Sequence, residues 1–176
     1  MRDVWPKFAP DSFFEFGFPY AGELSCGWRS GLVDVGLLME IVDGLGRRSL
    51  PLVPEEMEIS LLLSDDVDAA RRFAGDLCRY ERSDSGDVWQ YYVAAAIVDA
   101  TVDLEKRFDL LDSAWADFGY PREMRDVIYP EGSMPSRLDT RVGGRALAAF
   151  MNMWQERLSR RSPETRVSDN WAPNGR

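Results

Sequence analysis

The chain has 176 residues, of which 45% are hydrophobic and 12% aromatic, and this composition excludes a wholly disordered protein. It contains no histidine, which excludes Ser-His and Cys-His nucleophile pairs and histidine-based zinc sites. Its net charge of −9 disfavours nucleic acid as a partner, because phosphates repel a surface of the same sign.

The first 20 residues are aromatic and irregular. Four aromatic side chains alternate as in a β-strand: Phe14, Phe16, Phe18 and Tyr20. Gly17 and Pro19 disfavour a strand, however. The segment is therefore either a strand or an aromatic segment packed across helices, and we expect the second.

Four helices are predicted in the first half of the chain. A short helix covers Ala21–Trp28, and Asp34 is placed to cap a second helix that runs to Leu45. Pro54 is typical of the first turn of a third helix. Ser64 is placed to cap a fourth helix, which carries acidic residues in its first turn.

The second half of the chain has stronger helical patterns. Apolar residues recur with helical spacing over Asp87–Ala100, and Asp103 is placed to cap a helix that runs to Phe118. Tyr129–Gly144 is rich in proline and glycine and predicts a long loop, followed by a last helix over Arg145–Arg160. Three tryptophans fall on predicted core faces: Trp89, Trp115 and Trp154.

These patterns predict an all-α fold. We expect six to eight helices in antiparallel pairs, with the aromatic N-terminal segment packed across them. The predicted domain organisation is a single helical domain over residues 1–160 and a disordered basic tail over residues 161–176. The oligomeric state is left open.

Charge is distributed unevenly along the chain. Residues 1–140 contain 14 basic and 27 acidic side chains, a net charge of −13, whereas residues 141–176 contain 7 and 3, a net charge of +4. Such an acidic surface attracts basic proteins and speeds their encounter. The charge pattern therefore favours a cationic protein partner.

Cysteine content and hydropathy indicate the compartment. Cys26 and Cys78 form no CxxC pair, which predicts two reduced, buried thiols. Charged residues interrupt the N-terminal segment, so it does not have the pattern of a signal peptide. The longest apolar stretch, Val93–Val98, is too short to span a bilayer. We therefore predict a cytoplasmic protein that does not bind membranes.

The middle third of the chain contains the candidate binding residues. Its acidic residues are predicted to lie on outer helix faces: Glu55, Glu56, Glu58, Asp65, Asp66, Asp68, Asp84 and Asp87. They form either a solvated surface that aids solubility or a docking surface for a cationic protein. We select Asp65, Asp66, Asp68, Asp84 and Asp87 for electrostatic recognition. Trp28, beside Gly27 and Arg29, is a candidate anchor for a partner.

The acidic residues do not predict a metal site or a catalytic site. Neither Asp65–Asp68 nor Asp84–Asp87 has the alternating ligands, turn glycine and distal glutamate of a calcium loop. No pair of carboxylates is placed in an aromatic cleft, as glycoside hydrolysis would require. We therefore predict no metal, no cofactor and no catalytic residues.

Three segments resemble a bacterial family of unknown function. They are Cys26–Leu45, Asp87–Ala100 and Leu110–Gly132, and the most specific string is Ala-Asp-Phe-Gly-Tyr-Pro at Ala116–Pro121. The resemblance covers residues 13–132. Small acidic proteins of this kind are often encoded beside polymorphic or contact-dependent toxins and resemble their immunity proteins, and no catalytic residues are established for the family.

Charge and resemblance together lead to a functional prediction. We expect an immunity-type protein, not an enzyme, that binds and neutralises a cognate bacterial toxin through its acidic surface. A basic nuclease fits this charge best, because its substrate groove must attract phosphates. The alternative is a helical scaffold or regulatory protein that binds another cytosolic protein and is unrelated to toxins.

Overall fold

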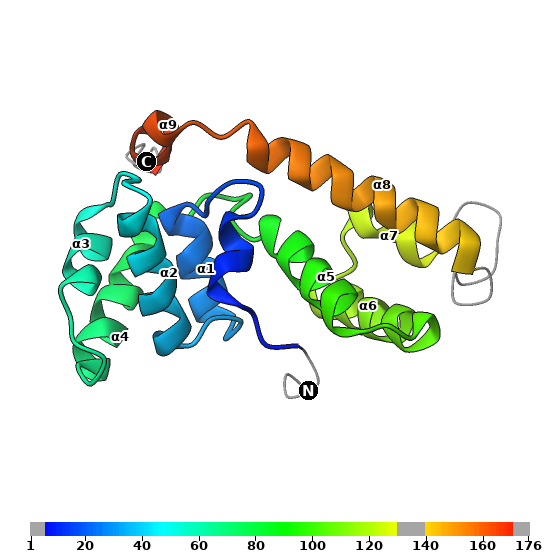
Figure 1. The fold of residues 1–176 in the computed structure, drawn as a ribbon, viewed down its shortest axis with the longest axis horizontal. Coiled ribbons are helices and arrows are strands. Elements are labelled where there is room, and N and C mark those ends of the chain that lie inside the picture. The colour runs from blue at the N-terminus through cyan, green and yellow to red at the C-terminus, as the bar shows by residue number, and fades with distance from the viewer. Residues whose placement is uncertain (1–5, 130–139, 171–176) are drawn as a thin grey trace. The chain divides into compact units, whose positions relative to one another are not determined.

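The computed structural model describes the backbone of residues 6–129 and 140–170, and side chains over residues 6–129 and 142–166. Within these ranges the regular structure is entirely helical, which confirms the predicted fold class. Nine α-helices are described, against the six to eight predicted (Figure 1). Two short 3₁₀ helices accompany them: η2 (Pro10–Phe14) and η3 (Leu77–Tyr80).

The chain forms two compact units. Unit 1 comprises Met1–Phe8 and Val88–Arg157, and unit 2 comprises Ala9–Asp87 and Leu158–Arg176. Only one domain was predicted over residues 1–160. That organisation stays a prediction, because the structure does not determine how the two units are placed relative to one another.

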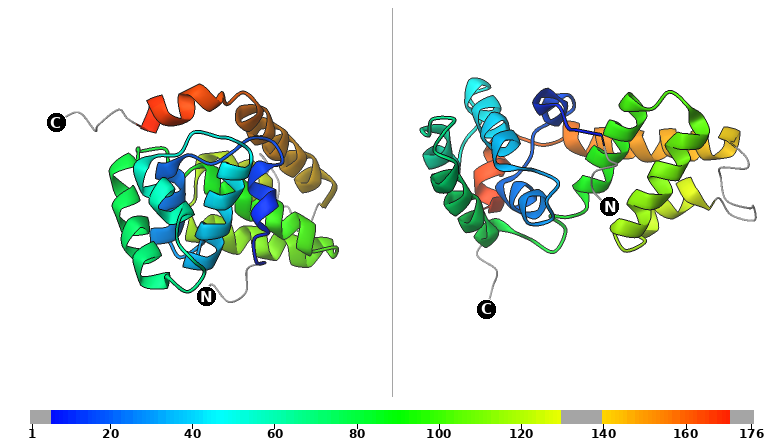
Figure 2. Two further views of the ribbon diagram at one scale, coloured as in Figure 1. Left: turned by 60° about the vertical axis from the view of Figure 1, so that its left-hand side comes forward. Right: turned by 90° about the horizontal axis from the view of Figure 1, so that it is seen from below.

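Unit 2 contains four short helices in the first half of the chain: α1 (Ala21–Arg29), α2 (Val35–Arg47), α3 (Pro54–Ser60) and α4 (Val67–Asp76). α2 packs against α1, α3, α4 and η2 (Figures 1 and 2). Its inner face supplies fully buried residues, among them Leu38, Ile41 and Leu45. The predicted helix pattern is therefore confirmed for α2, and Asp34 caps it by accepting a hydrogen bond from the Leu37 N–H at 2.8 Å.

Close contact between α1 and η3 depends on a glycine. A Cβ atom at Gly22 would collide with the backbone carbonyl of Tyr80, and the neighbouring Glu81 Cα would lie only 3.0 Å away. Any larger residue would therefore push α1 away from η3.

Unit 1 contains α5 (Val88–Ala100), α6 (Leu104–Asp117), α7 (Arg122–Ile128) and most of α8 (Thr140–Ser159). α5 packs against α6, and α6 packs against α7. Trp89 and Trp154 are buried as predicted. Trp115, which was also predicted to lie in the core, is only half-buried, and its ring contacts the exposed rings of Tyr120 and Tyr129, with centroids 4.8 and 5.3 Å away.

The N-terminal aromatic segment forms no strand in its described part. Residues Pro10–Phe14 form η2, and Phe13 and Phe18 are buried. Phe14 lies beneath the guanidinium of Arg48, which is 4.0 Å from the ring centroid. This arrangement agrees with the adopted alternative, an aromatic segment packed on helices.

Several predicted boundaries differ from the structure. The N-cap of α4 is Asp66, two residues after the predicted Ser64. α8 begins at Thr140, inside the predicted loop Tyr129–Gly144. Pro163–Asn170 forms α9 within the tail that was predicted to be disordered. Residues 163–170 were misjudged because their order depends on contacts with distant residues, and residues 171–176 of the predicted tail lie outside the described residues.

Candidate functional site

The first group of predicted binding residues lies where α3 turns into α4. Asp65, Asp66 and Asp68 are all exposed there. Asp66 has a local structural role as well, because its carboxylate accepts a hydrogen bond from the Leu63 N–H at 3.1 Å. Asp68 pairs with Arg71 at 3.2 Å, and both side chains are well exposed. The carboxylates of this turn therefore face solvent.

The second group lies in the connection from η3 to α5, on a different turn of unit 2. Asp84 and Asp87 are both exposed. The Asp87 N–H donates to the Asp84 carbonyl at 3.0 Å, and the Asp84 carboxylate lies 3.6 Å from Arg82 Nε. All five predicted aspartates thus lie on the surface of unit 2, and their role in partner binding stays a prediction.

Trp28 occupies the last turn of α1 and is half-buried. Its carbonyl accepts a hydrogen bond from the N–H of Gly31, which has a φ of 66° and bends the chain toward α2. Arg29 beside it pairs with Glu81 at 3.0 Å. Trp28 is therefore partly exposed at a hydrogen-bonded turn, and its role as an anchor for a partner stays a prediction.

Two glutamates assigned to the acidic surface are in fact buried. Only 4% of Glu55 and 0% of Glu56 is exposed. Glu55 accepts a hydrogen bond from the Tyr80 hydroxyl at 2.7 Å and pairs with Arg79. The sequence analysis placed them outside because acidic residues in a first helical turn usually face water, but here basic and phenolic partners allow burial.

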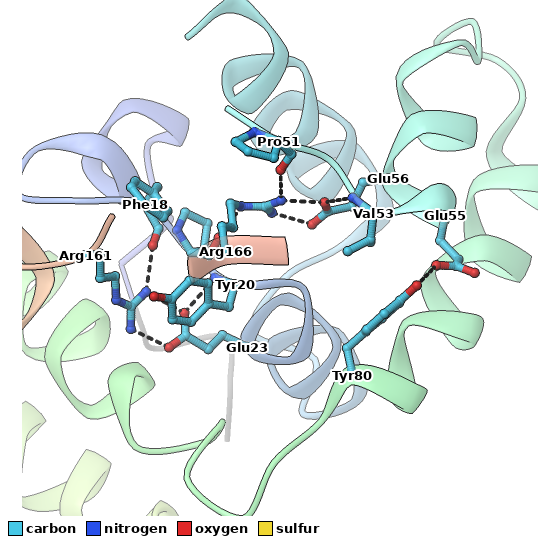
Figure 3. Close-up of polar contacts among 11 residues, drawn as sticks. Phe18, Tyr20, Glu23, Pro51, Val53, Glu55, Glu56, Tyr80, Arg161 and Arg166 are labelled. Carbon is cyan, nitrogen blue, oxygen red and sulfur yellow. Dashed lines mark hydrogen bonds and ion pairs between the residues drawn. The ribbon is translucent and has the colours of Figure 1, made fainter. Parts of the chain in front are cut away.

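Glu56 is the centre of a network that reaches the C-terminal segment. Its carboxylate accepts the N–H of Val53, the N-cap of α3, at 3.0 Å. The same carboxylate pairs with both Nη atoms of Arg166, at 2.8 and 2.5 Å. Arg166 also donates to the carbonyls of Pro19 and Pro51, and it is fully buried. Figure 3 shows this guanidinium enclosed by acceptors from several segments.

Glu23 repeats this arrangement at the start of α1. Its carboxylate accepts the N–H of the N-cap Tyr20 at 2.8 Å and pairs with both Nη atoms of Arg161, at 2.8 and 2.5 Å. Arg161 also donates to the Phe18 carbonyl at 2.6 Å (Figure 3). In both networks the glutamate is the third residue of its helix. In both, the arginine also donates to the carbonyl of the residue two positions before the N-cap, which is Phe18 in one network and Pro51 in the other.

The two networks attach the C-terminal segment to unit 2. A further contact joins the Tyr20 hydroxyl to Thr165 Oγ1 at 3.0 Å. Each oxygen of Glu23 and Glu56 is engaged by a guanidinium, so these carboxylates offer no free oxygen to a ligand. We therefore assign them to the architecture of unit 2 and place the candidate binding site on the exposed aspartates.

The thiols show little sign of nucleophilic chemistry. Both cysteines are free, but Cys78 is exposed and Cys26 half-buried, so the prediction of two buried thiols was wrong. Burial raises the pKa of the Cys26 thiol, and the nearby Glu81 carboxylate raises it further. Cys26 is therefore a protonated, weak nucleophile at neutral pH.

In the described part of the chain, no three His, Cys, Asp or Glu side chains are grouped so that they could hold a metal ion. Among the helices of residues 6–129 and 140–170, none has the length and apolar composition needed to cross a bilayer.

Residues 20–162 match the model of a family described as "Uncharacterized protein conserved in bacteria (DUF2247)". The chain belongs to this family. The predicted resemblance to a bacterial family of unknown function is thus confirmed, while the link to immunity proteins stays a prediction. The matched residues of this DUF2247 protein include Glu23, Glu56 and Arg161, whereas Arg166 lies outside. Neither a curated protein nor a solved structure matches the chain.

Sequence reasoning missed several residues that shape this surface. The arginines of the tail were not assigned any partner, and Leu61 and Leu63 were not recognised as exposed. A signal for the leucines was present, because a run of three apolar residues shortly before a helix start is unusual in a surface turn. The arginine pairings had no comparable signal, because Arg166 and Glu56 are 110 residues apart.

Proposed function

We propose that this DUF2247 protein is an immunity-type binding protein that neutralises a cognate bacterial toxin and catalyses no reaction. The toxin is a basic protein, and a nuclease fits best because its substrate groove must be positively charged. The binding surface comprises Asp65, Asp66, Asp68, Asp84 and Asp87, with Trp28 as an anchor.

A single observation carries the proposal: the negative charge is concentrated in unit 2 and its predicted aspartates are exposed. Unit 2 contains 18 acidic and 11 basic residues, a net charge of −7, whereas unit 1 contains 12 and 10, a net charge of −2. Glu23, Glu55 and Glu56 are paired inside the unit, so they are not available to a partner, whereas the five aspartates are exposed.

The local structure supports binding by a preformed surface. The hydrogen bond between Asp66 and the Leu63 N–H holds the α3–α4 turn in one conformation. A surface that is ordered before binding loses less entropy when the complex forms. Carboxylates held in this way mimic the phosphates of a nucleic acid and occlude a basic groove.

The proposal is tested by co-expression with the open reading frame next to the gene. We expect the neighbouring protein to be toxic alone and harmless with this chain. A variant with Asp65→Arg and Asp68→Arg should weaken binding by at least about tenfold at low salt and by much less at high salt. Folding should persist, because both side chains are exposed and the Asp68–Arg71 pair contributes little.

A matched control carries the same charge change in unit 1. Asp117→Arg and Asp126→Arg also replace two exposed aspartates, and they should leave binding unchanged. A neighbouring protein that is not toxic but binds this chain would favour the alternative function, a scaffold or regulator in the cytosol. Binding that is indifferent both to salt and to the unit 2 variant would overturn the acidic surface itself.

A further inference from the structure

The turn between α3 and α4 exposes large apolar side chains. Met57, Leu61 and Leu63 are 47, 78 and 69% exposed. Met57 and Leu61 are four residues apart at the end of α3 and therefore share a face. We call these three residues, together with the exposed acids Glu58, Asp65, Asp66 and Asp68, the α3–α4 corner. In Figure 1 it includes the tip where α3 and α4 are joined.

The corner is held rigidly by the opposite face of α3. Ile59 and Glu56 are buried there, and Glu56 is attached to Arg166. The turn itself is closed by two hydrogen bonds: Leu63 N–H to the Asp66 carboxylate at 3.1 Å, and Asp66 N–H to the Leu63 carbonyl at 3.0 Å. The exposed leucines are therefore presented in a fixed position, and their exposure is not the result of a loose loop.

All charged side chains within the sequence of the corner are acidic, and the first base that follows is Arg71, which pairs with Asp68 at 3.2 Å. Residues 49–70 contain six acidic side chains and no lysine or arginine. Glu55 and Glu56 are buried, so the other four carboxylates of this stretch are exposed, each within a few residues of the exposed apolar side chains in the sequence. Apolar contacts within a charged rim are the usual anatomy of a protein interface.

A second exposed apolar turn lacks this uniform charge. Val102 and Leu104, between α5 and α6, are 91 and 47% exposed. Lys106 and Arg107 follow directly, and Arg107 donates to the Thr101 carbonyl at 2.6 Å. The α5–α6 turn is therefore of mixed charge and serves as an internal comparison.

We infer that the α3–α4 corner is the docking contact for a protein partner that presents an apolar side chain among arginines or lysines. The inference rests on the proposed function for the identity of that partner, but the contact itself follows from the exposed leucines and the surrounding charge. Burying Leu61 and Leu63 supplies apolar contact, and the rim supplies selectivity for cations.

A defined probe tests the contact without the toxin. We would titrate the full-length protein with a short peptide of repeated Arg-Leu-Arg and follow the methyl signals of Leu61 and Leu63 by NMR, with affinity from calorimetry. Peptides of repeated Arg-Ser-Arg and Glu-Leu-Glu separate charge from apolar contact. We expect the Arg-Leu-Arg peptide to bind about tenfold more tightly than the Arg-Ser-Arg peptide, and the acidic peptide not to bind.

Matched variants locate the binding. Leu61→Ser with Leu63→Ser should reduce the affinity for the Arg-Leu-Arg peptide about tenfold, to that of the Arg-Ser-Arg peptide. Val102→Ser with Leu104→Ser should leave it unchanged. The inference is overturned if the two double variants behave alike, or if methyl shifts fall outside the corner. It is also overturned if sedimentation shows that the unmodified protein self-associates and that Leu61→Ser with Leu63→Ser abolishes this association, because a second copy of the chain then occupies the corner.

Failure of this inference differs from failure of the proposed function. If the leucine variant still protects against the toxin while the charge variant does not, the corner is not the contact but the immunity function stands. If the peptide binds at the corner and the neighbouring protein is not toxic, the contact stands and the immunity function is wrong.

Discussion

The two units bury their interiors by different means. α5 of unit 1 buries aromatic rings on several sides, and Trp89 makes edge contacts with Phe8 and Tyr92 at centroid distances of 5.8 and 5.5 Å. Unit 2 buries ion pairs in addition to apolar side chains, with Arg166 and Glu56 both 0% exposed. By sequence, unit 1 has 10 basic and 12 acidic residues, and unit 2 has 11 and 18.

This difference bears on function as well as on stability. A buried ion pair contributes little net free energy, because desolvation offsets attraction, but removing one partner is costly. The two pairs therefore act chiefly to specify where the C-terminal segment lies. The excess of carboxylates is larger in unit 2, which has seven more acidic than basic residues, than in unit 1, which has two more.

The largest effect is expected from removing aromatic packing in unit 1. Trp89→Ala should lower the free energy of unfolding by about 4 kcal/mol, because it leaves a large cavity beside Phe8 and Tyr92. Hydrogen exchange should show lost protection in α5 and α6 and retained protection in α2. Equal losses in α2 would show that the two units unfold together and would contradict their separation.

A somewhat smaller effect is expected from breaking the buried pair in unit 2. Arg166→Met should destabilise by about 3 kcal/mol, measured by urea denaturation, because Glu56 is left as a buried charge without its cation. Adding Glu56→Gln should recover at least half of the loss. If the second substitution instead adds its own full cost, the penalty does not come from an unpaired carboxylate.

The smallest effect concerns Cys26. Its pKa in the folded state is raised above 9.0, so the thiol ionises more readily in the unfolded chain. The resulting contribution to the free energy of unfolding is present at neutral pH and is lost as the pH rises above 9.0. Iodoacetamide should therefore modify the exposed Cys78 well before Cys26 at pH 8, as followed by mass spectrometry of peptides. Faster modification of Cys26 would contradict the effect of its burial. Cys26→Ser should make the free energy of unfolding fall less steeply above pH 9.0.

Local patterns in the sequence predicted much of the helical structure. Asp34 and Asp103 cap α2 and α6 as expected, and Pro54 begins α3. The exposure of the five aspartates was also predicted correctly. Capping and apolar periodicity depend on neighbours within a few residues, which is why they can be read from one chain.

The sequence by itself therefore determined the all-α class, most helix starts and the excess of negative charge. Only the tertiary structure decided which acids are buried, that the segment around Arg166 is helical, and that Leu61 and Leu63 lie at the surface. The physical reason is distance along the chain. Glu56 can be buried only because an arginine 110 residues away neutralises it, and no local pattern encodes that pairing.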